Sequence, residues 1–220
     1  MQIYAKNIHS LWLDKDNSLW LGLFLKGALH YIPHLNRTVD YNLLSEEVSS
    51  GFCIIEDKND HVWYGGPSGL FLIDKKKANA RPEKISPLRI FNLVQFNDSI
   101  LWAGTRKGSM FQINTRTLKV TSLPILPHTD LYVTYIYPDS HQRIWIGTDN
   151  NGLYVSDRNG SIIASYSKEQ LGSNAIKGII EDEMNNIWVG TGSGLCCINP
   201  QTENIDRYTT ADGLPINQFN

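Results

Sequence analysis

Acidic side chains recur in the sequence at a spacing that could serve catalysis. An aspartate stands six residues before four of the tryptophans, and further acids occur at Glu46-Glu47 and Glu181-Asp182-Glu183. Two carboxylates about 5–10 Å apart are what a glycosidase needs. Asp also bonds its own backbone in tight turns, so an acid repeated in unit after unit is expected to form turns instead. The four aspartates are Asp14, Asp57, Asp139 and Asp182.

Other catalytic and metal-binding signals are absent from the sequence. No Gly-x-Ser-x-Gly elbow occurs, and no Cys-x-x-Cys or His/Cys pair has ligand spacing. We therefore expect no enzyme activity, no metal and no cofactor. The cysteines are odd in number and two are adjacent, so we expect small buried or half-buried hydrophobes and no disulfide framework. They are Cys53, Cys196 and Cys197. The histidines that we expect to be exposed to solvent are His30, His34, His61 and His141.

Charge and hydropathy limit the classes of partner that this chain can bind. The 220 residues carry a net charge of −2, which does not suit a nucleic-acid or anionic-membrane surface. The basic run Lys75-Lys76-Lys77 adjoins a predicted turn and is expected to be a solvated loop. No apolar stretch approaches the roughly 18 residues of a membrane span, and no export signal follows Met1. We expect no membrane insertion, and either a cytoplasmic protein or a piece of a larger exported one.

A unit of about 43 residues, centred on a tryptophan, occurs five times. A glycine follows each tryptophan by two residues, and a second glycine stands six or seven residues on. Each unit contains a β-rich run, a polar turn, the Trp strand, a Gly-containing loop and two further strands. The repeated positions are Trp20, Trp63, Trp102, Trp145 and Trp188, with Gly22, Gly65, Gly104, Gly147 and Gly190.

Four short antiparallel strands per unit predict an all-β chain of β-propeller blades. Each tryptophan is expected to lie between stacked blades, where burying its ring stabilises the fold by roughly 2–3 kcal/mol. The glycine after it would let the neighbouring sheet approach closely. The predicted blades span about 8–47, 48–89, 90–131, 132–174 and 175–218, and a sixth begins at 219–220.

The segments Ile144–Leu153 and Ile187–Leu195 resemble the two-component regulator propeller repeat, and Asp212–Asn220 resembles that family's link between blades. The resemblance implies a periplasmic propeller of a hybrid two-component sensor that detects oligosaccharides. It also implies partners: remaining blades of an incomplete, open part of a seven-bladed propeller, downstream sensor domains, and a homodimer in the parent protein. This chain itself shows no phosphoacceptor or ATP-binding motif of the kinase.

Function on a propeller lies in its loops, and here the loops differ between repeats while the strands do not. Sugars are bound by aromatic faces and polar groups. The residues that we predict for ligand binding are Arg106, Lys107, Tyr132, Asp149, Asn150, Asn151, Asn174 and Ser193. Two alternatives stay open at this point: a protein-interaction scaffold, and a propeller-based lyase or glycosidase.

Overall fold

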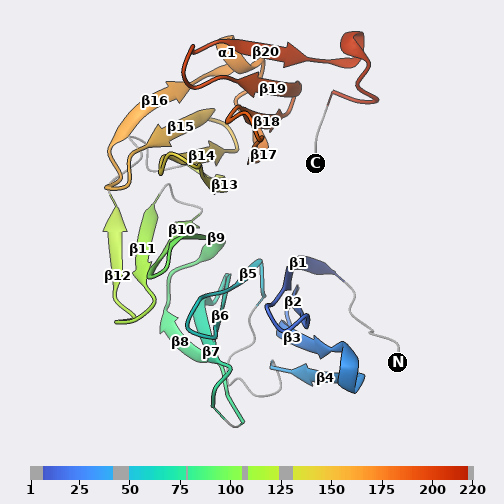
Figure 1. Ribbon diagram of the computed structural model, residues 1–220, viewed down its shortest axis with the longest axis vertical. Coiled ribbons are helices and arrows are strands. Elements are labelled where there is room, and N and C mark those ends of the chain that lie inside the picture. Colours follow the sequence, from blue (N-terminus) through green and yellow to red (C-terminus); the bar gives the residue numbers. More distant parts are fainter. Residues whose placement is uncertain (1–6, 42–49, 78, 106–108, 124–130, 218–220) are drawn as a thin grey trace. The chain divides into compact units, whose positions relative to one another are not determined.

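The computed structural model describes residues 7–41, 50–77, 79–105, 109–123 and 131–217 (Figure 1). The described strands form five four-stranded antiparallel sheets, and each sheet follows chain order from one edge to the other. This confirms the predicted all-β chain of propeller blades. We number the sheets as blades one to five. The first strands of the blades are β1 (Ile8–Leu13), β5 (Cys53–Glu56), β9 (Ile90–Asn97), β13 (Val133–Pro138) and β17 (Ile176–Glu181).

The second strand of each blade carries the tryptophan, and the third and fourth complete the sheet. The second strands are β2 (Leu19–Leu23), β6 (His61–Gly66), β10 (Ile100–Thr105), β14 (Ile144–Thr148) and β18 (Ile187–Thr191). The third strands are β3 (Gly27–Ile32), β7 (Gly69–Asp74), β11 (Met110–Asn114), β15 (Leu153–Ser156) and β19 (Gly194–Ile198). The fourth strands are β4 (Arg37–Asp40), β8 (Glu83–Ser86), β12 (Val120–Leu123), β16 (Ile162–Tyr166) and β20 (Ile205–Tyr208).

The chain divides into two compact units. The first unit comprises Met1–Ala103 and Gln112–Thr121, and the second comprises Gly104–Phe111 and Ser122–Asn220. Blades one and two belong to the first unit and blades four and five to the second, while the boundary passes through blade three.

One hydrogen-bonded arrangement is repeated in four blades. The aspartate six residues before the tryptophan closes the turn between the first two strands. Its Oδ1 accepts the backbone N–H groups two and four residues later, at 2.7–3.1 Å. Its Oδ2 accepts the indole Nε1–H of the tryptophan, at 2.8–3.0 Å. We call this arrangement the Asp–Trp clasp, and it joins a turn to the tryptophan ring, which is buried in blades one, two and four and half-buried in blade five. The pairs are Asp14–Trp20, Asp57–Trp63, Asp139–Trp145 and Asp182–Trp188.

Blade three lacks the clasp because Phe96 takes the place of the aspartate. There β9 continues through Phe96, and the turn shrinks to Asp98 and Ser99. Trp102 is fully buried, yet among the described residues no acceptor lies within hydrogen-bonding distance of its Nε1. Within one chain, therefore, buried tryptophans occur both with and without the carboxylate.

Because one tryptophan has the clasp and the other does not, the same Trp→Phe substitution should lower the free energy of unfolding by different amounts at the two positions. Trp63 and Trp102 are both 0% exposed. Trp63→Phe deprives the buried Asp57 of a donor and should destabilise the fold by about 1.5–3 kcal/mol beyond the loss of ring area. Trp102→Phe removes no hydrogen bond and should cost only the ring area. Urea denaturation of both variants measures the difference, and equal losses would contradict the role of the clasp.

The glycine after the tryptophan lies against the next blade. A methyl group on Gly147 would lie 2.6 Å from Cγ2 of Ile176, which begins the first strand of blade five. A methyl group on Gly65 would lie 2.7 Å from Cγ2 of Ile90, and one on Gly104 would lie 2.8 Å from Cγ1 of Val133. The expected close approach is present at these junctions, because any side chain would push the neighbouring strand away.

Substituting this glycine should therefore be costly. Gly147→Ala forces a methyl group into the strand-to-strand contact and should destabilise the fold by about 1–3 kcal/mol. Gly178→Ala is the matched control, since no heavy atom lies within 4 Å of a methyl group there. Its effect should stay within about 0.5 kcal/mol. Thermal denaturation checks both, and a neutral Gly147→Ala would refute the close-packing account.

A tyrosine at the end of the fourth strand completes the packing in three blades. Tyr166 stacks on Trp145 with ring centroids 5.9 Å apart, and Tyr208 stacks on Trp188 at 5.6 Å. In blade one, Tyr41 stacks on Trp20 at 5.3 Å. The tryptophan thus has a carboxylate on its edge and an aromatic ring on its face.

Candidate functional site

The predicted loops of blades four and five are tied together by backbone hydrogen bonds. The N–H of Asp149, just after β14, donates to the carbonyl of Tyr132, just before β13, at 3.0 Å. The N–H of Gly152 donates to the carbonyl of Asn174, in the link to blade five, at 2.9 Å. The structure therefore brings hairpin loops and blade-to-blade links together at one end of these strands.

Polar side chains project from this loop cluster, which we define as Tyr132, Asp149, Asn150, Asn151 and Lys177. Tyr132 is 44% exposed, and Asn150 and Asn151 are exposed. Lys177 Nζ lies 3.8 Å from Asp149 Oδ1. The cluster offers an aromatic ring, two amides and a charge pair, which are groups that can recognise hydroxyl-rich ligands.

Asn174 has a structural role beside the cluster. Its Oδ1 accepts the backbone N–H of Lys168 at 2.7 Å, at the start of the short helix α1 (Lys168–Leu171). We did not predict this helix. A capping box of Ser167 with Gln170 begins it, and Gly172 ends it at φ +79°. The pattern Ser-x-x-Gln before a glycine was the signal for it in the sequence.

Ser193 lies apart from the loop cluster as defined, in a small pocket of blade five. The pocket has a volume of about 380 Å³, and Arg207, Tyr208 and Leu171 also line it. The two remaining predicted residues, Arg106 and Lys107, lie outside the described residues.

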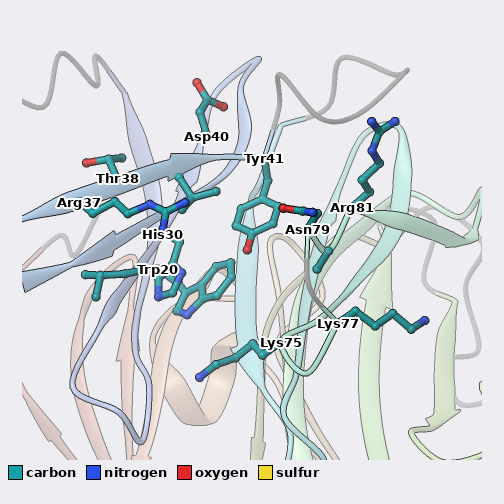
Figure 2. A pocket seen from close by; sticks show the side chains of 13 residues that line it. Trp20, His30, Arg37, Thr38, Asp40, Tyr41, Lys75, Lys77, Asn79 and Arg81 are labelled. Carbon is teal, nitrogen blue, oxygen red and sulfur yellow. The ribbon is translucent and has the colours of Figure 1, made fainter. Parts of the chain in front are cut away.

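A larger groove lies in the first unit, where the sequence analysis placed no site. It has a volume of about 860 Å³ and is lined by β3, β4 and the segment between β7 and β8 (Figure 2). Arg37 and Tyr41 come from one side, and Lys77, Asn79 and Arg81 from the other. The sequence gave no signal for this groove, because its lining residues are scattered over two repeats and basic residues in outer strands and turns form no distinctive pattern.

Beside this groove an acidic cluster surrounds one lysine. Oxygens of Asp14, Asp16 and Glu56 lie within 4.8 Å of one another, a spacing that could hold a metal ion. Lys75 Nζ lies 2.8 Å from each of the three carboxylates and occupies that position itself. The expectation of a solvated Lys75 is therefore wrong: its side chain is only 14% exposed, because it neutralises this cluster. Lys76 and Lys77 are exposed as expected.

The ion pairs decide the charge states in this cluster. Burial raises the pKa of Asp14, but hydrogen bonds from Lys75, Ser18 and Trp20 outweigh burial and hold the pKa well below its usual range. Burial lowers the pKa of Lys75, but bonds to the three carboxylates outweigh it and hold the pKa above its usual range. Lys75 and the three carboxylates are held by ion pairs with each other, so the cluster stabilises the junction of blades one and two.

His30 is part of the same network, and the expectation that it is exposed is wrong. It is 9% exposed and stacks on Trp20 with ring centroids 4.0 Å apart. Ser18 Oγ donates to Asp14 Oδ2 at 2.6 Å and lies 2.5 Å from His30 Nε2. Nε2 must therefore carry the hydrogen that it shares with Ser18. Of the others, His34 and His141 are exposed, and His61 is half-buried against Asp57.

His30 should make stability depend on pH. Burial lowers its pKa to about 4 from the usual 6.5, although Asp14 opposes the shift. The unfolded chain then binds a proton that the folded chain does not, so stability falls as the pH drops from about 6.5 to 4, by about 2–3 kcal/mol. Urea denaturation at pH 7, 6, 5 and 4 should show a flatter profile for His30→Gln. An unchanged profile would contradict this, and His34→Gln is the exposed control.

Comparison with known proteins finds similarity to one propeller family and to solved propeller structures. The two component regulator propeller family matches residues 128–150 and 170–193. Histidine kinase P4 of Formosa agariphila is 26% identical over an alignment 282 residues long, gaps included. The alignment covers 97% of this chain and 20% of the relative. None of the described helices has the length and hydrophobicity that a membrane crossing requires.

Solved structures share the fold at low identity. The extracellular domain assigned to the hybrid two component system BT3049 of B. thetaiotaomicron has a TM-score of 0.79 at 21% identity, over 100% of this chain and 31% of that chain. PorZ, a surface component of the type-IX secretion system of Porphyromonas gingivalis, has a TM-score of 0.68 at 18% identity, over 86% of this chain and 31% of that chain. The chain thus spans about a fifth to a third of the length of these proteins.

Proposed function

Because the chain carries two-component regulator propeller repeats at residues 128–150 and 170–193, we propose that it is a non-catalytic sensory module of a two-component sensor histidine kinase. Its ligand is an oligosaccharide, met in the periplasm, and binding controls transcription through the rest of the parent protein. The likeness to Histidine kinase P4 and to the extracellular domain assigned to BT3049 supports this placement.

The observation that carries the proposal is the loop cluster of blades four and five. The two matched segments contain Tyr132, Asp149 and Asn150, together with Asn174 and Ser193. The backbone bonds Asp149–Tyr132 and Gly152–Asn174 hold the loops on the strand ends. Because the loops are already held in place, the side chains that would contact the ligand lose little conformational freedom on binding, which favours affinity.

The chemistry of the cluster suits a neutral sugar. An exposed aromatic ring can pack against the apolar face of a pyranose, while amides both donate to and accept from hydroxyl groups. The acid of the cluster, Asp149, lies 3.8 Å from Lys177 Nζ. Glu181 lies at the opposite end of β17, where it accepts from the backbone N–H and Oγ of Ser140 at 2.8 and 2.7 Å. These contacts favour binding over glycoside cleavage.

A titration with neutral oligosaccharides tests the proposal, with the intact sensor ectodomain and its backbone NMR resonances as the readout. At least one member of the panel should shift residues 132 and 149–151 in a saturable way. Asn150→Ala should weaken that binding by up to about tenfold, since it removes one or two hydrogen bonds. Gln201→Ala is the control, because Gln201 is exposed in the turn at the opposite end of blade five.

Two results would refute the proposal. One is the absence of any saturable response at these residues across the panel. The other is an Asn150→Ala affinity equal to that of Gln201→Ala, which would move the site away from the loop cluster.

A further inference from the structure

The groove in blades one and two has the charge pattern of an anion site. Its lining contains the basic side chains Arg37, Lys75, Lys77 and Arg81 against one acidic side chain, Asp40. Its volume of about 860 Å³ lies in the range of small-molecule sites. In Figure 2, Asp40 points away from the hydroxyl of Tyr41.

In the part of the chain that the structure describes, carboxylates already pair with the two lysines of this lining but not with its two arginines. Lys75 is bound by three carboxylates, and Lys77 Nζ lies 3.7 Å from Asp74. No carboxylate among the described residues pairs with Arg37 or Arg81. Two exposed arginines therefore line the groove without a described carboxylate partner, and guanidinium is the side chain best suited to bidentate binding of an oxyanion.

Tyr41 supplies a second and independent observation. Its side chain is 9% exposed, and its ring is fixed by stacking on Trp20 and by the bond of its backbone N–H to the carbonyl of Ala28 at 3.0 Å. Its hydroxyl makes no hydrogen bond to any described residue and is directed into the groove, between Arg37 and Asn79 (Figure 2). The residue is buried while its hydroxyl opens onto the groove, so this hydroxyl is a fixed donor that a bound acceptor can engage.

Electrostatics keeps this hydroxyl a donor. Burial raises the pKa of Tyr41, while Arg37 and Lys75 act in the opposite direction. The hydroxyl stays protonated at neutral pH, and the nearby Arg37 makes the position favourable for negative charge. The stack of Tyr41, Trp20 and His30 behind it is held in turn by the Asp14 clasp. The donor is therefore part of a rigid wall.

We propose that this groove binds a small acidic ligand, whose carboxylate or sulfate is attracted by Arg37 and Arg81 from opposite sides of the groove and accepts a hydrogen bond from the hydroxyl of Tyr41. Asn79 contributes an amide that can bond to neutral groups of the same ligand. The site belongs to the first unit and does not depend on the loop cluster in the second, so it adds a second ligand class to the neutral oligosaccharide proposed above.

Three probes on one sugar scaffold test the site in the full chain. Glucuronic acid carries a carboxylate, glucose 6-sulfate carries a sulfate ester, and glucose carries no charge. At least one charged probe should shift the backbone resonances of β4 and of residues 79–81 in a saturable way, while glucose should not. The response should weaken as salt is added, because the charges are near the surface.

Matched variants assign the binding to named groups. Arg37→Gln and Arg81→Gln should each weaken binding of the charged probe at least about tenfold, as expected for a lost charge-assisted bond. Tyr41→Phe keeps the stacked ring and should weaken binding about threefold to tenfold. Arg116→Gln, an exposed arginine outside the groove, should leave the affinity within about twofold.

The proposal is overturned if neither charged probe gives a saturable response at these residues, or if glucose binds as well as they do. It is also overturned if Arg37→Gln and Arg81→Gln both retain the affinity of the unaltered chain. Because the readout is at β4 and residues 79–81, the result is independent of whether neutral sugars shift residues 132 and 149–151.

Discussion

The hydrogen bond from a buried tryptophan to the aspartate six residues earlier sets the form of each blade that contains it. The carboxylate satisfies two turn N–H groups with one oxygen and the indole with the other. It thereby fixes the first hairpin and the ring in one step, and buried polar groups of this kind require such partners. Once the ring is fixed, the glycine beyond it can meet the next strand without a side chain between them.

This arrangement separates the residues that hold the blades together from the loops that we propose to bind ligand. The clasp lies at the turn end of the first two strands, whereas the loops of blades four and five leave from the other end. Loop residues can therefore change without disturbing the packed rings, as they do between the repeats of this chain. The same scaffold forms the rear wall of the groove in blade one, where Tyr41 rests on Trp20.

Much of the fold could be predicted because it depends on a repeated pattern. The tryptophans and the strands are periodic through all five units, and the turn aspartate recurs in four of them. The aspartate was predicted as a turn former, but its bond to the indole was not, since a spacing of six does not reveal which way a side chain points. The tyrosine at the end of the fourth strand in three blades was also missed, although Tyr41, Tyr166 and Tyr208 share one place in their blades. Lys75 was misjudged because its burial depends on the neighbouring blade, where Asp14 and Asp16 come within reach. His30 was misjudged because the sequence does not reveal that its ring packs on Trp20 of the same blade. Contacts of this kind follow from three-dimensional packing and have no local signature.

The most direct test of this account is hydrogen exchange at the indole N–H groups, followed by NMR in the intact chain. Trp20, Trp63 and Trp102 are all 0% exposed and Trp145 is 1% exposed, so burial alone would protect them alike. The clasp predicts slow exchange and downfield indole resonances for Trp20, Trp63 and Trp145, and markedly faster exchange for Trp102, which has no acceptor. Equal protection of Trp102 and the other three would show that burial, and not the carboxylate, holds the rings in place.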